Sequence, residues 1–311
     1  VLIGSVWWII DASWGWHYGG WMVKYLGYHD AYASGVIHAI AGGYALGVLW
    51  VLGPRIGKFS SNGKPRDIPP HNPWMVTLGI FMIYTGFWGF YAACNVPLIS
   101  PEVIGGEIVG TTWTATNIYL APTTLGAITV NFLLSLSGGL MATYIVSKGD
   151  AFWTFSGGLA GIIGASAGND LYHPMQALII GAIVPVIAYK LHNYVERKFK
   201  IDDAVGAVAV HGYAGFLGVV IAGFVLWGAP SSPFEGYAVI TPWGQLAGAI
   251  IMFLVLGFIP AYVVARIQAA RGTLRIPAEV ELQGLDLGGQ QAYDDAVAEI
   301  TAASAKHIKS E

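Results

Sequence analysis

The sequence has little charge and almost no cysteine. Only 11% of its 311 residues are Asp, Glu, Lys or Arg, whereas soluble domains carry roughly 25%. The single cysteine, Cys94, excludes an intramolecular disulfide framework and a cysteine-rich metal site. The net charge of −3 gives no reason to expect a polyanionic partner such as nucleic acid. The chain instead has 55% hydrophobic residues, 42 glycines and 12 tryptophans, which excludes a disordered protein and most soluble enzymes and indicates an integral membrane protein.

Seven stretches are apolar enough to cross the ~30 Å hydrocarbon core of a bilayer. They cover about 31–53, 74–95, 119–146, 151–168, 174–191, 205–228 and 242–265. Residues 1–10 are also apolar, and because the chain opens inside this run we expect the end of a further span there. From about 276 the chain becomes acidic. We therefore predict a transmembrane domain over 1–275 and a cytoplasmic tail over 276–311, partly helical at 291–306.

The positive charges are distributed unequally between the two sides of the membrane. If the spans alternate in direction, 14 of the 15 Lys and Arg residues fall on one side and only Lys24 falls on the other. Cytoplasmic loops are enriched in Lys and Arg. This distribution predicts a cytoplasmic C-terminus, and it predicts that the span at 31–53 runs from the outside to the inside.

Two histidines lie inside apolar spans, where an ionisable side chain is costly and usually functional. Asp30 precedes His38 by eight residues in DAYASGVIHAIAGG. Asp203 precedes His211 by the same number in DAVGAVAVHGYAGF. Eight helical residues rise about 12 Å, so each histidine should lie near the bilayer midplane and each aspartate at a helix N-terminus, where it can cap free N–H groups. The two spans run in opposite directions, a pattern typical of an inverted repeat with a site at the repeat interface.

The histidine pair allows three functional interpretations besides a packing role. Neutral imidazoles can relay a proton or hydrogen-bond a small polar molecule. Two histidines from different helices can also bind a haem iron for electron transfer. A metal site would need a third or fourth ligand, and the sequence places no Cys, Asp or Glu at matching depth. The metal interpretation is therefore the weakest of the three.

Four segments resemble motifs of the Amt/MEP/Rh superfamily of ammonium transporters, in that family's order. GYHDAYASGVIHAIAGG is similar to its Asp-Phe-Ala-Gly-Gly-x-x-x-His segment, and PHNPWMVTLGIFMIYTGFWGFYAAC to its HN-P … GW-GFN-GS helix. IDDAVGAVAVHGYAGFLGVVIAGF is similar to its IDD … VHG segment, and TLRIPAEVELQGLDLGGQQAY to its cytoplasmic tail motif. The chain thus resembles the C-terminal two-thirds of such a transporter, of the bacterial Amt branch and N-terminally incomplete.

The resemblance implies an all-α integral membrane protein with an eleven-helix inverted-repeat fold. About the last seven and a half helices would be present, from the end of helix four to helix eleven. The resemblance also implies a multi-pass protein of the cell (inner) membrane, without cofactor or enzymatic activity. The family is usually a homotrimer with one pore for ammonium or ammonia per subunit. Its tail touches neighbouring subunits and can dock a P-II-type signal protein.

The resemblance also assigns roles to individual residues. His38 and His211 match the twin histidines that line the pore. Trp16, Phe90, Cys94 and Asp30 match the outer site where ammonium is recruited, with His17 as a competitor for the place of Trp16, and Asp203 matches a residue of structural support. Ammonium would lose a proton near this site before ammonia passes the histidines. The remaining histidines are expected to be solvated, namely His17, His29, His71, His173, His192 and His307.

Four residues depart from the family's motifs. Cys94 stands where the family commonly has a serine, and a thiol is a weaker hydrogen-bond acceptor than a hydroxyl. Tyr91 replaces an asparagine, Tyr32 is bulkier than the usual small residue, and Gly206 replaces an acidic residue often found before the second histidine. We therefore expect a transporter of altered affinity, with an ammonium sensor or transceptor of little flux and an Rh-like gas channel as alternatives.

Overall fold

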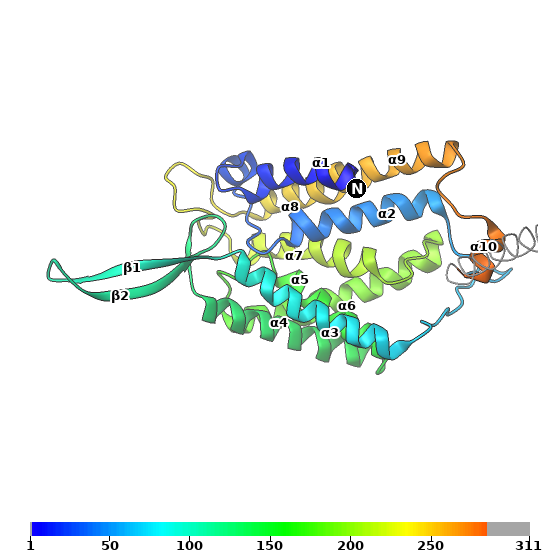
Figure 1. Cartoon of the computed structure of the whole chain (residues 1–311), viewed down its shortest axis with the longest axis horizontal. Helices are drawn as coiled ribbons and strands as arrows, with labels where there is room; N and C mark the ends of the chain where they lie inside the picture. Colours follow the sequence, from blue (N-terminus) through cyan, green and yellow to red (C-terminus); the bar gives the residue numbers. More distant parts are fainter. Residues whose placement is uncertain (1, 285–311) are drawn as a thin grey trace, which may run out of the picture.

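The computed structural model describes residues 2–284, which form a bundle of helices that run along one long axis (Figure 1). The α-helices are α1 (Leu2–Asp11), α2 (Ile40–Leu52), α3 (Pro73–Ala93), α4 (Leu125–Val146), α5 (Ala151–Ala165), α6 (Pro174–Phe199), α7 (Ala214–Val225), α8 (Pro242–Ile250), α9 (Ile259–Ala270) and α10 (Ala278–Gln283). Five π-helical segments continue or precede them: η1 (Ala12–Trp16), η2 (Met22–Leu26), η3 (Ser34–Ala39), η4 (Val208–Tyr213) and η5 (Ile251–Phe258). The predictions for 291–306 and His307 lie outside the described residues.

The predicted spans are present as helices. Within residues 2–284, six helical segments are long and apolar enough to cross a membrane: Ser34–Leu52, Pro73–Ala93, Leu125–Val146, Pro174–Phe199, Val208–Val225 and Pro242–Ala270. The stretch predicted at 151–168 is α5, whose 15 residues are too short for this criterion. Its residues from Ser156 to Ala165 are all buried. Because α5 packs inside the bundle against α4, α6 and α7, its surroundings provide the apolar contacts that lipid would otherwise supply.

The helices begin where the sequence supplies caps. The Asn72 side chain accepts a hydrogen bond from the Met75 amide at the start of α3 (3.1 Å). Pro73 takes the first helical position, where a missing N–H costs nothing. The side chains of Thr124, Asp150, His173 and Thr241 cap the starts of α4, α5, α6 and α8 in the same way.

The segment 96–118, expected only as a loop, contains a β-hairpin. Strand β1 (Val96–Ile104) pairs antiparallel with β2 (Glu107–Thr116), which also pairs with the short β3 (Pro122–Thr123). Gly105 and Gly106 form the two-residue turn with φ of 63° and 89°, as hairpin turns with positive φ at both positions require. The hairpin projects from the end of the bundle opposite α10 (Figure 1). The mostly helical prediction is thus confirmed, but the chain is not purely α-helical.

Candidate functional site

Each predicted aspartate caps the segment that carries its histidine. The Asp30 carboxylate accepts hydrogen bonds from the amides of Gly35 (2.7 Å) and Val36 (2.9 Å). The Asp203 carboxylate accepts one from the Ala209 amide (3.1 Å). These bonds satisfy N–H groups that the first turn of a helix leaves free. The capping role predicted from the spacing therefore agrees with the geometry at both positions.

The equivalence of the two segments extends beyond the aspartate and histidine. Three residues after each aspartate, the backbone adopts the left-handed conformation, at Ala33 (φ 69°) and at Gly206 (φ 68°). Each of these residues donates its N–H to the carbonyl of the preceding aspartate, at 3.2 and 3.1 Å. In each copy the backbone then continues into a π-helical segment, η3 or η4, that contains the histidine. One backbone pattern is thus used twice.

The two imidazoles meet directly. The Nδ1 atoms of His38 and His211 are 3.1 Å apart, and the ring centroids are 5.2 Å apart with an angle of 22° between planes. His38 is buried, and its ring stacks on the Phe87 ring at 5.2 Å. A bond between two Nδ1 atoms requires one of them to be protonated and the other not. Two neutral rings meet this requirement in opposite tautomers, which leaves one Nε2 as an acceptor and the other Nε2 as a donor.

Glycines allow the two segments to approach this closely. Each lies four residues after a histidine. A Cβ added to Gly42 would lie 3.1 Å from the carbonyl carbon of His211. A Cβ added to Gly215 would lie 3.2 Å from the carbonyl carbon of His38 and 2.7 Å from the Ala39 nitrogen. The contacts are reciprocal, as expected of two copies of one motif that cross at small residues.

This geometry disfavours two of the earlier interpretations. A bis-histidine haem requires the porphyrin plane between the two rings, and here the rings hydrogen-bond each other directly. Among residues 2–284, no group of three or more His, Cys, Asp or Glu side chains is placed to hold a metal ion. The arrangement fits hydrogen bonding and proton exchange.

Part of the predicted outer site also assembles. The Trp16 and Phe90 rings stack at 5.8 Å with 21° between planes, and both are half-buried. The Trp16 indole N–H donates to the Ala31 carbonyl (3.4 Å), which fixes the ring beside the Asp30 turn. Cys94 follows one turn after Phe90, with its amide bonded to the Phe90 carbonyl (3.0 Å), and its side chain is buried. The cluster therefore joins the end of α3 to η1, segments far apart in the sequence.

Asp30 itself is fully buried rather than open to the outside. Burial raises its pKa to about 6, although bonds from the Val36 and Gly35 amides and from the Tyr28 hydroxyl lower it. One carboxylate oxygen carries all three of these bonds, and the other has no partner among the described residues. Among the described residues, Asp30 therefore has the contacts of a buried helix cap and not those of an exposed ammonium-binding side chain.

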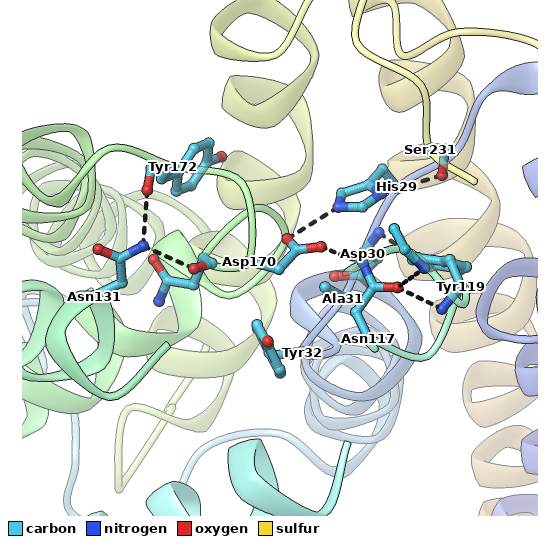
Figure 2. A network of polar contacts seen from close by, with 12 residues as sticks. His29, Asp30, Ala31, Tyr32, Asn117, Tyr119, Asn131, Asp170, Tyr172 and Ser231 are labelled. Atoms are coloured by element: carbon cyan, nitrogen blue, oxygen red, sulfur yellow. Dashed lines mark hydrogen bonds and ion pairs between the residues drawn. The ribbon is translucent and has the colours of Figure 1, made fainter. Parts of the chain in front are cut away.

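His29, predicted to be solvated, is instead completely buried. Figure 2 shows it between two loops: its Nε2 lies 3.1 Å from Asp170 and its Nδ1 3.1 Å from Ser231. Asn117 bonds the other oxygen of Asp170 at 2.5 Å. Sequence reasoning missed this network because its members are 53 to 202 positions apart. His192 is also less exposed than expected, half-buried at 3.5 Å from Asp203, whereas His17, His71 and His173 are exposed.

A sequence profile of the Ammonium Transporter Family matches residues 1–293. The chain belongs to this family. It is 33% identical to the ammonium transporter Amt2 of Methanocaldococcus jannaschii, over 86% of this chain and 57% of that protein. It is 31% identical to the ammonium transporter Amt2 of Archaeoglobus fulgidus, over 94% of this chain and 62% of that protein. The chain thus spans about three-fifths of the length of these relatives.

Solved structures agree with this fold. A structure described as a sensor Amt protein matches with a TM-score of 0.72 and 24% identity, over 92% of this chain and 67% of that one. Candida albicans Mep2 matches with a TM-score of 0.65 and 21% identity, over 88% and 57%. Nitrosomonas europaea Rh50 matches with a TM-score of 0.62 and 18% identity, over 97% and 72%. At these identities the likeness establishes the fold alone.

Two departures of this ammonium transporter family member from the family's motifs contact each other. The rings of Tyr32 and Tyr91 stack at 4.1 Å with 11° between planes, and both are buried. The Tyr32 hydroxyl donates to Asn95 (3.0 Å), and the Tyr91 hydroxyl lies 2.5 Å from the Ser166 hydroxyl. Because one aromatic ring packs on the other, the two tyrosines form one packing unit. The sequence showed both residues but not their contact.

Proposed function

We propose that the chain is a transporter, not an enzyme, and that it conducts ammonium or ammonia through a pore centred on His38 and His211. The observation that carries the proposal is the direct contact of these two buried imidazoles, at 3.1 Å, on oppositely directed copies of one motif. An ion crosses an apolar interior only at high cost. Ammonium would therefore give up a proton near the outer site and pass the centre as ammonia.

The histidine pair is suited to carry that proton. In the neutral pair one Nε2 accepts and the other Nε2 donates. A proton taken up at the first Nε2 can be matched by release from the second, with the shared Nδ1 proton moving between the rings. Ammonia and the proton would then cross separately, which gives net movement of one positive charge per ammonium.

The outer site would recruit ammonium through Trp16 and Phe90, by attraction of the cation to aromatic faces. Cys94 lies one turn after Phe90, and its thiol would provide only a weak acceptor. Asp30 would hold the outer turn in shape and favour a cation electrostatically, while Asp203 would support the opposite segment. The stacked pair at this site supports the proposal, because it brings together two residues that the family resemblance assigned to recruitment.

Replacement of both His38 and His211 by alanine tests the proposal in liposomes. We expect methylammonium uptake and the accompanying current to be lost, because the proton path and the polar centre are removed together. His71→Ala, which removes an exposed histidine, is the matched control and should transport normally. Uptake by the double variant equal to that of wild type would refute the pore assignment. Uptake of ammonia without current by the wild type would favour an Rh-like gas channel.

A second candidate is an ammonium sensor or transceptor with little flux. The stacked tyrosines favour it, because they fill space beside the outer site where the family's motifs have smaller residues. Saturable ammonium binding, measured by calorimetry, without methylammonium flux would decide for this candidate.

We further propose that 1–275 forms the transporter part of a homotrimer in the cell (inner) membrane, with 276–311 as a cytoplasmic tail that a P-II-type protein can dock. One support is α3, whose side chains Trp74, Phe81 and Met82 are exposed on the single chain. Such an apolar face needs lipid or protein to cover it. Light scattering in detergent should give the mass of three chains, and added P-II-type protein should co-elute only when the tail is intact.

A further inference from the structure

Three loops meet at the buried imidazole of His29, and a fourth joins them through Asn117 (Figure 2). His29 lies between η2 and η3, Asp170 between α5 and α6, and Ser231 between α7 and α8. Asn117 lies between β2 and β3, at the base of the hairpin. The transport mechanism proposed above makes no use of this network.

The hydrogen bonds of His29 require a proton on both ring nitrogens. The Ser231 hydroxyl has a single proton, which it donates to the Tyr28 carbonyl (2.9 Å). It can therefore only accept from Nδ1 of His29, 3.1 Å away. The Asp170 carboxylate accepts only, so Nε2 of His29 must donate to it as well, also over 3.1 Å. A neutral imidazole has one N–H donor, whereas an imidazolium has two.

A neutral His29 would leave one of these groups without a partner. With the proton on Nε2, Ser231 would have to turn its hydroxyl toward the ring, and the Tyr28 carbonyl would lose this donor. With the proton on Nδ1, the lone pair of Nε2 would face the Asp170 carboxylate. Both side chains of the pair have 0% exposure, so bulk water cannot replace the lost bond, and such a loss is costly. A carboxyl group is a stronger acid than an imidazolium, which places the proton on His29.

Asn117 connects this ion pair to the outer site. Its side-chain amide donates to the second carboxylate oxygen of the pair (2.5 Å), and its side-chain oxygen accepts from the Tyr119 amide (2.9 Å). The Tyr119 hydroxyl accepts from the Asp30 amide (3.0 Å) and donates to the Gly15 carbonyl (2.8 Å). Gly15 directly precedes Trp16. A continuous series of buried bonds therefore fixes both the turn at Asp30 and the segment that carries the outer aromatic ring.

The second copy of the repeated motif has an ion pair at the same position. Asp202 precedes the cap Asp203 as His29 precedes the cap Asp30. The Asp202 carboxylate accepts two hydrogen bonds from the Arg55 guanidinium, at 2.7 and 2.9 Å. In each copy the residue before the cap thus holds a distant segment, with the sign of its charge reversed between the copies. This equivalence supports a charged His29.

The surroundings of His29 leave one carboxylate as its counter-charge. The titratable residues next to it in the sequence or in contact with its ring, among those that the structure describes, are Tyr28, Asp30, Tyr119 and Asp170. From α8 only the neutral Gln245 contacts it, through bonds to its backbone N–H (2.9 Å) and carbonyl (2.6 Å). The carboxylate of Asp30 is directed to its own cap, so Asp170 is the anion that pairs with the ring.

We propose that His29 is a positioning residue: held as an imidazolium by Asp170, it keeps the outer site assembled, so that loss of its proton weakens the recruitment of ammonium. The role in recruitment rests on the proposed function, whereas the charge of His29 does not. The assembled form is the protonated one, so affinity for ammonium is complete at low outer pH and falls as rising pH removes the proton.

Nitrogen NMR of the full chain in detergent, labelled with nitrogen-15 histidine, tests the charge directly. At pH 7 both ring nitrogens of His29 should carry protons, with His29→Gln used to assign the signal. The exposed His71 should be mostly neutral, because an unperturbed histidine is half-protonated near about 6.5. Asp170→Asn should remove the second proton from His29. A single ring proton on wild-type His29 at pH 7 would overturn the proposal, whatever the chain transports.

Methylammonium uptake into liposomes tests the positioning role. Asp170→Asn should raise KM roughly tenfold, the factor expected for one hydrogen bond to a charged group, with the maximal rate little changed because the histidine pair is intact. The KM of the wild type should rise as the outer pH is raised, whereas that of Asp170→Asn should be high already at pH 7 and vary less. Glu235→Gln, which removes an exposed carboxylate from the loop that holds Ser231, is the matched control and should leave KM unchanged.

The outcomes separate this role from the proposed function. An unchanged KM in Asp170→Asn, or a lower maximal rate at unchanged KM, would overturn the positioning role. If Asp170→Asn fails to fold, Ser231→Ala removes the acceptor of Nδ1 and should shift KM in the same direction. If the wild type binds ammonium without flux, the same tenfold change should appear in Kd by calorimetry, and its absence would overturn the role. A wild type that neither binds nor transports would overturn the proposed function and the positioning role together, with the charge of His29 still decided by NMR.

Discussion

Gly215 controls how closely the two histidine segments approach. A Cβ at this position would lie 2.7 Å from the Ala39 nitrogen, whereas ordinary contact begins at 3.4 Å. The nearest atoms to the added Cβ are the Ser34 carbonyl oxygen and the Ala39 nitrogen, and both belong to the backbone. Gly215→Ala should therefore separate the segments by at least about 0.7 Å. The His38–His211 separation of 3.1 Å would grow to about 3.8 Å, which is too long for a hydrogen bond.

Methylammonium uptake into liposomes measures the consequence. We expect at least a tenfold lower rate, since misplacement by about 1 Å can cost even more when groups must be aligned. Overpacking should also lower the free energy of unfolding by about 1–3 kcal/mol. Gly42→Ala, at the reciprocal crossing, should behave alike.

Gly79→Ala is the matched control, because a Cβ there meets nothing within 4 Å. It should leave uptake unchanged. A Gly215→Ala protein that elutes and melts like the control but transports at the wild-type rate would refute the link between the glycine crossing and the function of the histidine pair.

Three further predictions concern residues around this centre. Gly206→Ala should destabilise the protein by about 1 kcal/mol or more in thermal unfolding, because alanine is strained at φ 68°. Gly79→Ala should not destabilise it, because a Cβ there meets nothing within 4 Å. Burial raises the pKa of Asp202, but the hydrogen bonds and the charge of Arg55 together outweigh this effect. The pKa of Asp202 is therefore lowered overall. Its contribution to stability should therefore be complete above the unfolded value of about 4 and be lost as pH falls below it, and melting curves of Asp202→Asn should show less acid sensitivity than wild type. Tyr32→Ala and Tyr91→Asn should be non-additive by about 0.5–1.5 kcal/mol in a double-mutant cycle; additive effects would mean that their stacking contributes nothing.

Hydropathy and spacing predicted most of the membrane-spanning helices and the histidine pair, because both signals are local. The β-hairpin also left a local signal, a Gly105-Gly106 turn between Val-, Ile- and Thr-containing runs, which the apolar background obscured. The burial of His29 left no such signal. Its partners Asp170 and Ser231 are polar loop residues in the sequence, and only the closing of three loops on one another makes them a network.

The two copies of the repeat adopt the same left-handed turn with different residues. The family's motif has glycine at the place of Ala33, and this chain keeps the left-handed conformation there with alanine (φ 69°). At the equivalent place in the second copy the chain has glycine, Gly206, where an acidic residue is often found. The amide of this left-handed residue donates to the aspartate carbonyl in both cases. Because Asp30 and Asp203 hold each turn through their caps, the conformation is imposed by the cap and the helix crossing rather than by the residue in the turn. The geometry of the histidine pair therefore depends on the caps and on the glycines at the crossing. Substitutions in the turns should lower the stability of the protein while leaving the separation of the imidazoles nearly unchanged.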